Sequence, residues 1–428
     1  MKWPYIKIKS KYEILICVML FLLGAKLLDP DDELLSIGKR ISYGEVLFCI
    51  YMFMMVLKAL HRNSISWLFL SGTQKIFIYV LMCFTAWTAL SWCINTVLYD
   101  GEIMDFFGIP VRVLFYCAMS VFVARWVYRY GPTTIVLSYC SGIFTMFCYN
   151  FISLFIKTGS VPAGITNNTF SAVLLPSSAI YLGLAGMISP GILSLLLMCA
   201  AFASTLLVYS LSGLLYLFLG LPAILISIHD FFTRKEVEKS KRIIAVLILS
   251  LAVLTVVSRF GFAFEGLIQN IHNKINNIPL SEMAKYDVQS GDERWGLALS
   301  AFMISLKNPF FGVGEYNFQA ENYKNKDWIG EKFLDHKNPH NALAQIPSMF
   351  GIPAFLLFMT SFFIAFKQLY YLRILKGPRW KIFVLSSLFV FFATANVMDA
   401  IFTTTYFYFY AAVIFGIHAI LRRNRIVQ

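Results

Sequence analysis

Charged residues are scarce in this chain. Only 14% of its 428 residues are Asp, Glu, Lys or Arg, whereas typical soluble domains have about 25%. Hydrophobic residues make up 58%, and the mean hydropathy is +0.69. One soluble core cannot hide that much apolar sequence, so the composition predicts an integral membrane protein. The apolar runs are continuous and lack the period-two alternation of membrane strands, which excludes a transmembrane β-barrel.

The chain also lacks the short motifs of several enzyme classes. It has no Walker A loop and no HExxH pair, and none of its eight cysteines forms a CxxC pair. The cysteines lie in or beside apolar runs, so they indicate core packing and predict neither a zinc site nor a disulfide framework. His336 and His340 are four residues apart, but Pro339 between them opposes a continuous helix. We therefore expect no metal and no cofactor.

Apolar runs of about 20 residues, the length of a membrane span, recur along the chain. They predict an all-α fold with about 12 transmembrane helices, near residues 12–28, 43–60, 76–97, 107–127, 132–156, 169–187, 190–207, 212–229, 242–258, 341–366, 380–397 and 401–421. The chain then divides into an N-terminal bundle (1–258, about nine helices), one large loop (259–340) and a C-terminal group (341–428, about three helices). Within the loop, apolar residues at helical spacing predict an amphipathic helix over Glu293–Lys307, on the membrane surface or on the bundle.

The basic residues are distributed unevenly between the two sets of loops. Most of the 36 Lys and Arg residues lie in the set that contains both termini and the stretches Arg234–Arg242 and Lys367–Lys381. This asymmetry predicts that both termini are cytoplasmic and that the large loop faces outward. The net charge of +13 is then a topology signal, and we expect no nucleic-acid partner.

The end of the large loop holds the first candidate for chemistry. Asn338, Pro339 and His340 predict a helix start, with Asn as N-cap, Pro in the first helical position and His in the first turn. The positive helix end and partial burial would keep His340 neutral and able to accept a proton. The same helix end suits a phosphate. Alternatively, His340 is an interfacial side chain that caps the span.

Two other features of the loop have both a plain and a functional interpretation. Arg294 stands beside Asp292 and Glu293, so it forms a surface ion pair or a bidentate clamp on phosphate oxygens. Gly312 and Gly314 predict a tight turn, and a single GxG is weak evidence for phosphate binding. Charged residues near the spans lie at predicted helix ends, which favours an external active site over a permeation path.

One set of motifs resembles the signature of bacterial O-antigen ligases and O-antigen polymerases, namely Arg294-Trp295, Asn308-Pro309-Phe-Phe-Gly312-Val-Gly314 with Phe318, His340-Asn341 and Gly351-Ile-Pro353. The nine residues between Asn341 and Gly351 match the family spacing. The number of spans, the large outward loop and the cytoplasmic termini agree as well, so we expect a GT-C-like membrane fold. The motifs cover Arg294 to Pro353, and the rest of the chain agrees in topology alone.

The resemblance implies a glycosyltransferase of the bacterial inner membrane with a periplasmic active site. It would move a glycan from undecaprenyl pyrophosphate to a sugar hydroxyl, without a nucleotide sugar or a metal. His340 would be the base or the residue that orients the acceptor, and Arg294 would bind the lipid pyrophosphate. The implied partners are the lipid-linked glycan donor, a glycan or lipid A core acceptor, membrane lipid and a chain-length regulator.

The sequence departs from the family pattern at one place. Many members, ligases especially, carry an arginine after a Ser or Thr at the outer end of the seventh span, where this chain has Leu211. A second phosphate-binding cation must then come from elsewhere, with Arg259, Arg112 and Lys307 as candidates. Gly312, Gly314 and Asn341 complete the expected substrate-binding residues. The Gly312-Val-Gly314 pattern and Leu211 favour a polymerase, with two alternatives: a ligase, and a carrier or flippase for lipid-linked sugars.

Overall fold

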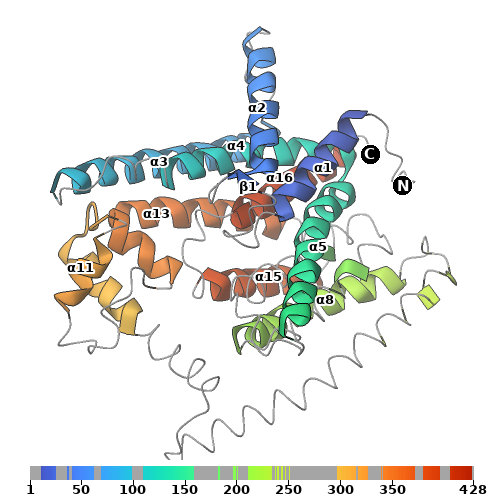
Figure 1. Cartoon of the computed structure of the whole chain (residues 1–428). Helices are drawn as coiled ribbons and strands as arrows, with labels where there is room; N and C mark the ends of the chain where they lie inside the picture. The colour runs from blue at the N-terminus through green and yellow to red at the C-terminus, as the bar shows by residue number, and fades with distance from the viewer. Residues whose placement is uncertain are drawn as a thin grey trace, which may run out of the picture.

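The computed structural model describes residues 11–25, 36–37, 41–61, 69–98, 109–158, 182–183, 196–198, 200, 211–233, 237, 239–240, 242–243, 246, 250, 296–314, 317–325, 339, 341–371, 379–395 and 405–426. Nearly all of them are helical (Figure 1). The helices are α1 (Lys11–Ala25), α2 (Tyr43–His61), α3 (Gly72–Leu98), α4 (Ile109–Tyr130), α5 (Pro132–Thr158), α8 (Leu211–Thr233), α11 (Phe318–Tyr323), α13 (Ala342–Tyr371), α15 (Arg379–Ala395) and α16 (Thr405–Ile426). A further apolar helix covers Gly296–Lys307.

The all-α prediction is confirmed for the described part of the chain, with one addition. Two short antiparallel strands, β1 (Ser36–Ile37) and β2 (Ile41–Ser42), form a hairpin that the sequence analysis did not predict. Nine of the predicted apolar runs coincide with a described helix. The runs near 169–187, 190–207 and 242–258 lie largely outside the described residues, so the total of about 12 spans stays a prediction.

Three of the described helices are long and apolar enough to cross a membrane. They are Gly72–Leu98, Pro110–Tyr130 and Ile352–Tyr371. Their length fits the requirement of about 20 apolar residues for a span. Shorter apolar helices include Tyr12–Ala25 and Leu219–Thr233.

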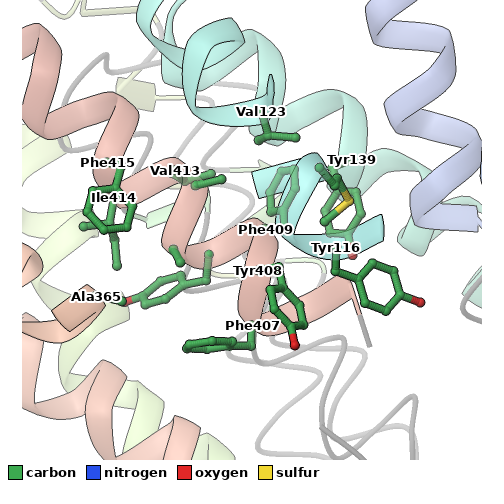
Figure 2. Close-up of a cluster of buried hydrophobic side chains, with 14 of the residues drawn as sticks. Tyr116, Val123, Tyr139, Ala365, Phe407, Tyr408, Phe409, Val413, Ile414 and Phe415 are labelled. Carbon is green, nitrogen blue, oxygen red and sulfur yellow. The ribbon is translucent and has the colours of Figure 1, made fainter. Parts of the chain in front are cut away.

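Helix α16 forms the centre of the bundle. Every residue from Phe407 to Ile417 is buried, which is the mark of a helix surrounded by other helices rather than one with a single apolar face. Its aromatic side chains stack on neighbouring helices, as in the pair Tyr139–Phe409 with ring centroids 3.9 Å apart and the pair Tyr116–Tyr408 at 5.4 Å (Figure 2). These contacts join α4, α5 and α16.

Close backbone approach joins α1 to α5. A Cβ atom on Gly24 would overlap the carbonyl oxygen of Tyr139, and a Cβ atom on Gly142 would overlap that of Phe21. Small residues at such crossings let two membrane helices pack at short distance, where the hydrophobic effect between helices is weak. In another pair, α8 and α15, Ser386 donates a hydrogen bond to the carbonyl oxygen of Leu219.

Helices α3 and α13 lie side by side and run in opposite directions (Figure 1). Trp87 of α3 contacts Phe350 of α13, while Phe84, one turn earlier in α3, contacts Phe358, further along α13, with ring centroids 5.8 Å apart and ring planes tilted by 49°. The beginning of α3 therefore meets the end of α13.

Basic residues gather at this end of the bundle. Lys75 lies over the ring of Tyr79 near the start of α3, and Lys367 lies over Tyr371 at the end of α13. The sequence places both cations on the predicted cytoplasmic side. The opposite end of α3, at Asn95, is about 30 Å from Lys75 at about 1.5 Å per residue, which matches the hydrocarbon thickness of a bilayer.

Candidate functional site: a joint between the large loop and helix α13

The helix predicted within the large loop is present. The described helix Gly296–Lys307 agrees with the prediction for Glu293–Lys307. One face, with Leu297, Ala301 and Ile304, is buried, while Phe302 and Leu306 are exposed. The exposed side chains are apolar too, as expected for a helix that rests against the bundle and faces lipid with its other side.

Helix α13 is broken at Gly351. Gly351 has φ 87° and ψ 167°, a conformation that is essentially restricted to glycine. The break divides α13 into a short first segment, Ala342–Phe350, and the long apolar segment Ile352–Tyr371. A break inside a helix frees backbone groups that need new partners, above all in a membrane protein, where water cannot supply them.

The loop after the helix Gly296–Lys307 supplies most of these partners. Ile352 N–H donates to the carbonyl oxygen of Pro309 at 2.7 Å. Val313 N–H and Gly314 N–H donate to the carbonyl oxygens of Ser348 and Met349, both at 2.9 Å. The residues 309–314 therefore act as an irregular strand that replaces the hydrogen bonds lost at the break.

Pro353 explains why the carbonyl oxygen of Met349 has no donor from within α13. In an unbroken helix the N–H of residue 353 would donate to the carbonyl oxygen of Met349, but proline has no N–H. Gly314 N–H takes that acceptor instead. The Gly351-Ile-Pro353 motif and the Gly312-Val-Gly314 motif are therefore two halves of one structure.

We call the contact between the loop residues 309–314 and the break in α13 the joint. Three polar side chains of helix α3 also bind to it. Trp87 Nε1 donates to the carbonyl oxygen of Phe350 at 3.1 Å and to that of Phe310 at 3.3 Å. Its ring stacks on Phe311 with centroids 5.3 Å apart and planes 11° from parallel. The joint therefore involves three segments: α3, the loop and α13.

The other two side chains of α3 bind one carbonyl group of the loop. Ser91 Oγ donates to the carbonyl oxygen of Phe311 at 2.5 Å, and Asn95 Nδ2 donates to the same oxygen at 3.1 Å. Asn95 also lies against Gly314, where a Cβ atom would come within 3.1 Å of the Asn95 Cβ. The loop is thus held from both sides.

The glycines of the turn have a structural role in this joint. Gly312 has φ 60°, and a Cβ atom there would overlap the backbone of Met349. Gly314 has φ 82°. Their backbone N–H groups already donate inside the protein, Gly312 to the carbonyl oxygen of Asn308 and Gly314 to that of Met349. Phosphate binding by Gly312 and Gly314 stays a prediction, and these two N–H groups already have protein acceptors.

The predicted start of the helix that follows the large loop is wrong. The helix begins at Ala342, with Asn341 as its cap rather than Asn338. Asn341 Oδ1 accepts hydrogen bonds from Leu343 N–H at 3.0 Å and Ala344 N–H at 3.1 Å. His340 therefore precedes the cap and does not lie in the first turn. The first-turn donors expected to favour a phosphate are partly used by Asn341 itself.

The structure locates some of the predicted site residues and leaves others out. His340, Arg294 and Arg259 lie outside the described residues. Lys307 is exposed at the end of its helix, where Nζ donates to Asn325 Oδ1 at 2.9 Å. Arg112 is exposed in the first turn of α4. Within the described part of the chain no hydrogen bond or ion pair connects Lys307 or Arg112 to the joint, so their binding roles stay predictions.

Arg294 and His340 are close in the sequence to the two helices that end at the joint. Arg294 comes two residues before the helix Gly296–Lys307, and His340 comes two residues before α13. Both helices end at the joint, after about 18 Å for Gly296–Lys307 and about 14 Å for the first segment of α13. The joint therefore sets the relative direction of the two helices that carry Arg294 and His340 at their starts.

Sequence reasoning missed the α3 side of the site. Trp87, Ser91 and Asn95 are spaced four residues apart, so they share one face of α3. Ser91 and Asn95 are buried in a helix long and apolar enough to span a membrane. The signal was present as a stripe of uncharged polar residues, but the search for polar residues inside spans considered charges alone.

The described helices and the joint are those of a helical membrane protein in which the segment 296–314 packs against the helix bundle. The sequence model of the O-antigen ligase family matches residues 192–359, which include the joint and the motifs from Arg294 to Pro353. This matched region, which is less than half of the chain, is similar to O-antigen ligases and supports a relationship to the O-antigen ligase and polymerase family. No curated protein matches the chain. Family and apolar helices together indicate a membrane glycosyltransferase of lipopolysaccharide biosynthesis in the inner membrane.

Residue Leu211, where many ligases carry an arginine, is the first residue of α8. The seventh predicted span, near 190–207, lies largely outside the described residues, so the expected place of this position at the outer end of that span stays a prediction. Among the described residues, no group of three His, Cys, Asp or Glu side chains could hold a metal ion. His336 and His340 lie outside the described residues.

Proposed function

We propose that this protein is a surface-polysaccharide polymerase that transfers a glycan from undecaprenyl pyrophosphate to the sugar hydroxyl of a second glycan chain. The observation that carries the proposal is the joint itself. It brings together the Asn308–Gly314 and Gly351–Pro353 motifs, which are far apart in the sequence and are shared with O-antigen ligases and polymerases. The helices that meet there carry Arg294 and His340 at their starts.

In the proposed reaction, His340 accepts the proton of the acceptor hydroxyl as the oxygen attacks the anomeric carbon of the donor glycan. A new carbon–oxygen bond forms, and the bond from the anomeric carbon to the pyrophosphate oxygen breaks. The pyrophosphate leaves on its undecaprenyl chain with both bonding electrons. The proton rests on the imidazole until it passes to solvent.

Positive charge must stabilise the departing pyrophosphate. Arg294 is suited to this because guanidinium binds two phosphate oxygens at once. Lys307 is a candidate for the second cation, since its ammonium group has three donors and Asn325 accepts a hydrogen bond from it. Arg112 and Arg259 are the other candidates. The reaction needs neither a nucleotide sugar nor a metal in this proposal.

The alternative is a ligase, which uses the same donor and attaches the glycan to the lipid A core. Leu211 favours the polymerase, because the arginine common in ligases is replaced by an uncharged residue at the start of α8. A carrier or flippase for lipid-linked sugars is the non-enzymatic alternative. Ser91 and Asn95, two of the described buried polar residues of α3, hold the joint by their hydrogen bonds, which favours an external site over a permeation path.

The gel profile of surface polysaccharide from a strain without this protein separates these functions. Loss of a polymerase leaves a single repeat unit attached to the core. Loss of a ligase removes the attached glycan, and long chains accumulate on the lipid carrier. An unchanged profile, or accumulation of single lipid-linked units on the cytoplasmic side, contradicts both transferase assignments.

A further inference from the structure

We infer that Trp87, Ser91 and Asn95 of α3 are positioning residues for the transfer reaction, because they fix the joint that orients the helices carrying Arg294 and His340. This inference rests on the proposed function. All three residues lie outside the matched region 192–359, in the N-terminal half of the chain. Their hydrogen bonds go to backbone carbonyl groups of the joint, and they act through that backbone.

The hydrogen bonds of α3 are directed at carbonyl groups that the break exposes. In an unbroken helix the carbonyl oxygen of Phe350 would accept from the N–H of Ala354, and at the joint Trp87 Nε1 donates to it. Ser91 and Asn95 both donate to the carbonyl oxygen of Phe311 in the loop. A buried acceptor without a donor is costly, so these side chains strongly favour one arrangement of the three segments.

Two neighbouring polar residues of α3, Thr85 and Thr88, form hydrogen bonds of a different kind. Thr85 Oγ1 donates to the carbonyl oxygen of Leu81, and Thr88 Oγ1 donates to that of Thr85, both at 2.9 Å. Both hydroxyl groups thus bond within α3. Trp87, Ser91 and Asn95, in contrast, donate hydrogen bonds to carbonyl groups of other segments, although Asn95 Nδ2 also donates to the carbonyl oxygen of Ser91 within α3.

The geometry amplifies small movements of the joint. The first segment of α13 starts about 14 Å from the break, and the helix Gly296–Lys307 starts about 18 Å from its own end at the joint. In the sequence, His340 and Arg294 each come two residues before one of these helix starts. A tilt of about 5° at the joint would move either helix start by about 1 Å at that length. A misplacement of about 1 Å can lower a rate about 100-fold. The α3 side chains therefore act on turnover without touching the substrate.

The test compares Trp87→Phe, Ser91→Ala and Asn95→Ala with the matched control Thr88→Ala in full-length protein reconstituted in lipid vesicles. Trp87→Phe keeps an aromatic ring against Phe311 and loses the N–H donor. We expect kcat to fall about 10- to 100-fold in the three variants, with the KM for lipid-linked glycan little changed. Thr88→Ala should keep wild-type turnover. Ser91→Thr, which keeps the hydroxyl, should restore much of the activity of Ser91→Ala.

Hydrogen exchange provides a readout that does not depend on activity. The amides of Val313, Gly314 and Ile352 should exchange faster in Trp87→Phe and Asn95→Ala than in Thr88→Ala, while the amides in the middle of α16 keep their protection. Normal turnover or normal exchange at the joint in these variants overturns the inference. Loss of protection throughout the bundle also overturns it, because the residues would then serve general folding.

Failure of the inference and failure of the proposed function give different results. If His340→Ala is inactive while Trp87→Phe and Asn95→Ala have wild-type kcat, the positioning role is wrong and the transferase proposal stands. If wild-type protein transfers no glycan, or if His340→Ala is fully active, the proposed function or its mechanism is wrong.

Discussion

The indole N–H of Trp87 in α3 donates a hydrogen bond, 3.1 Å long, to the carbonyl oxygen of Phe350, the last residue of α13 before its break. This contact joins two residues that are 263 positions apart in the sequence. It links the N-terminal half of the chain to the region shared with O-antigen ligases. The joint built around it explains why several glycines and a proline are needed in the motif region.

We expect Gly351→Ala to prevent stable folding of the joint. The conformation of Gly351 is restricted to glycine, which costs about 1–3 kcal/mol for another residue, and the added methyl group would overlap the carbonyl oxygen of Phe310. The measurement is the amount of folded, monodisperse protein and its thermal unfolding midpoint in detergent. Gly72→Ala is the matched control, because nothing lies within 4 Å of that position. Equal midpoints for the two variants would contradict the structural role.

We expect Asn341→Ala to weaken the start of α13. The side chain caps two backbone N–H groups, and loss of such a cap costs about 1 kcal/mol. Asn341→Ser keeps a good capping residue and should retain most of the stability and the turnover. If Asn341→Ser unfolds at the wild-type temperature but loses transfer, Asn341 binds substrate as the sequence comparison predicted, in addition to capping the helix.

We expect Arg294→Lys to lower transfer strongly although the charge is kept. A guanidinium binds phosphate oxygens in a bidentate manner that an ammonium cannot reproduce, and loss of one charge-assisted hydrogen bond costs about 1.5–3 kcal/mol, or about ten-fold or more in rate. Turnover by the purified variant measures this. Arg129→Lys, in the last turn of α4, is the control and should be active. Similar turnover of both variants would remove Arg294 from pyrophosphate binding.

We expect Lys307→Met to raise the KM for the lipid-linked donor if Lys307 is the second cation. The methionine keeps the length of the side chain and removes its charge. Lys324→Met serves as the control, because Lys324 pairs with Glu321 in α11. An unchanged KM in Lys307→Met would leave Arg112 and Arg259 as the candidates for that role.

The fold was largely accessible from the sequence because membrane spans depend on local composition. The run 76–97 lies within helix α3 and most of the run 107–127 lies within α4, since each run satisfies its backbone hydrogen bonds within itself. The hairpin of β1 and β2 was missed because two residues per strand give no periodicity to detect. The start of α13 was misplaced by three residues, since both Asn338 and Asn341 are suitable caps and only tertiary contacts choose between them.

The candidate site was accessible only in part. Gly312, Gly314 and Gly351 were recognised as a motif, but their mutual contact depends on how the loop folds back on α13, which no local pattern encodes. The stripe Trp87, Ser91 and Asn95 has clear helical spacing, and what it holds could not be known without the position of Phe311. Long-range pairing of this kind arises from tertiary packing rather than from local propensity.

The most direct test of the central claim is glycan transfer by the purified protein in vesicles, with undecaprenyl-pyrophosphate-linked repeat units as the only substrate and a chelator present. We expect wild-type protein to form chains of several repeat units and to release undecaprenyl pyrophosphate, and we expect His340→Ala to form neither while folding normally. Chains of wild-type length from His340→Ala, or no transfer by the wild-type protein under these conditions, would contradict the account.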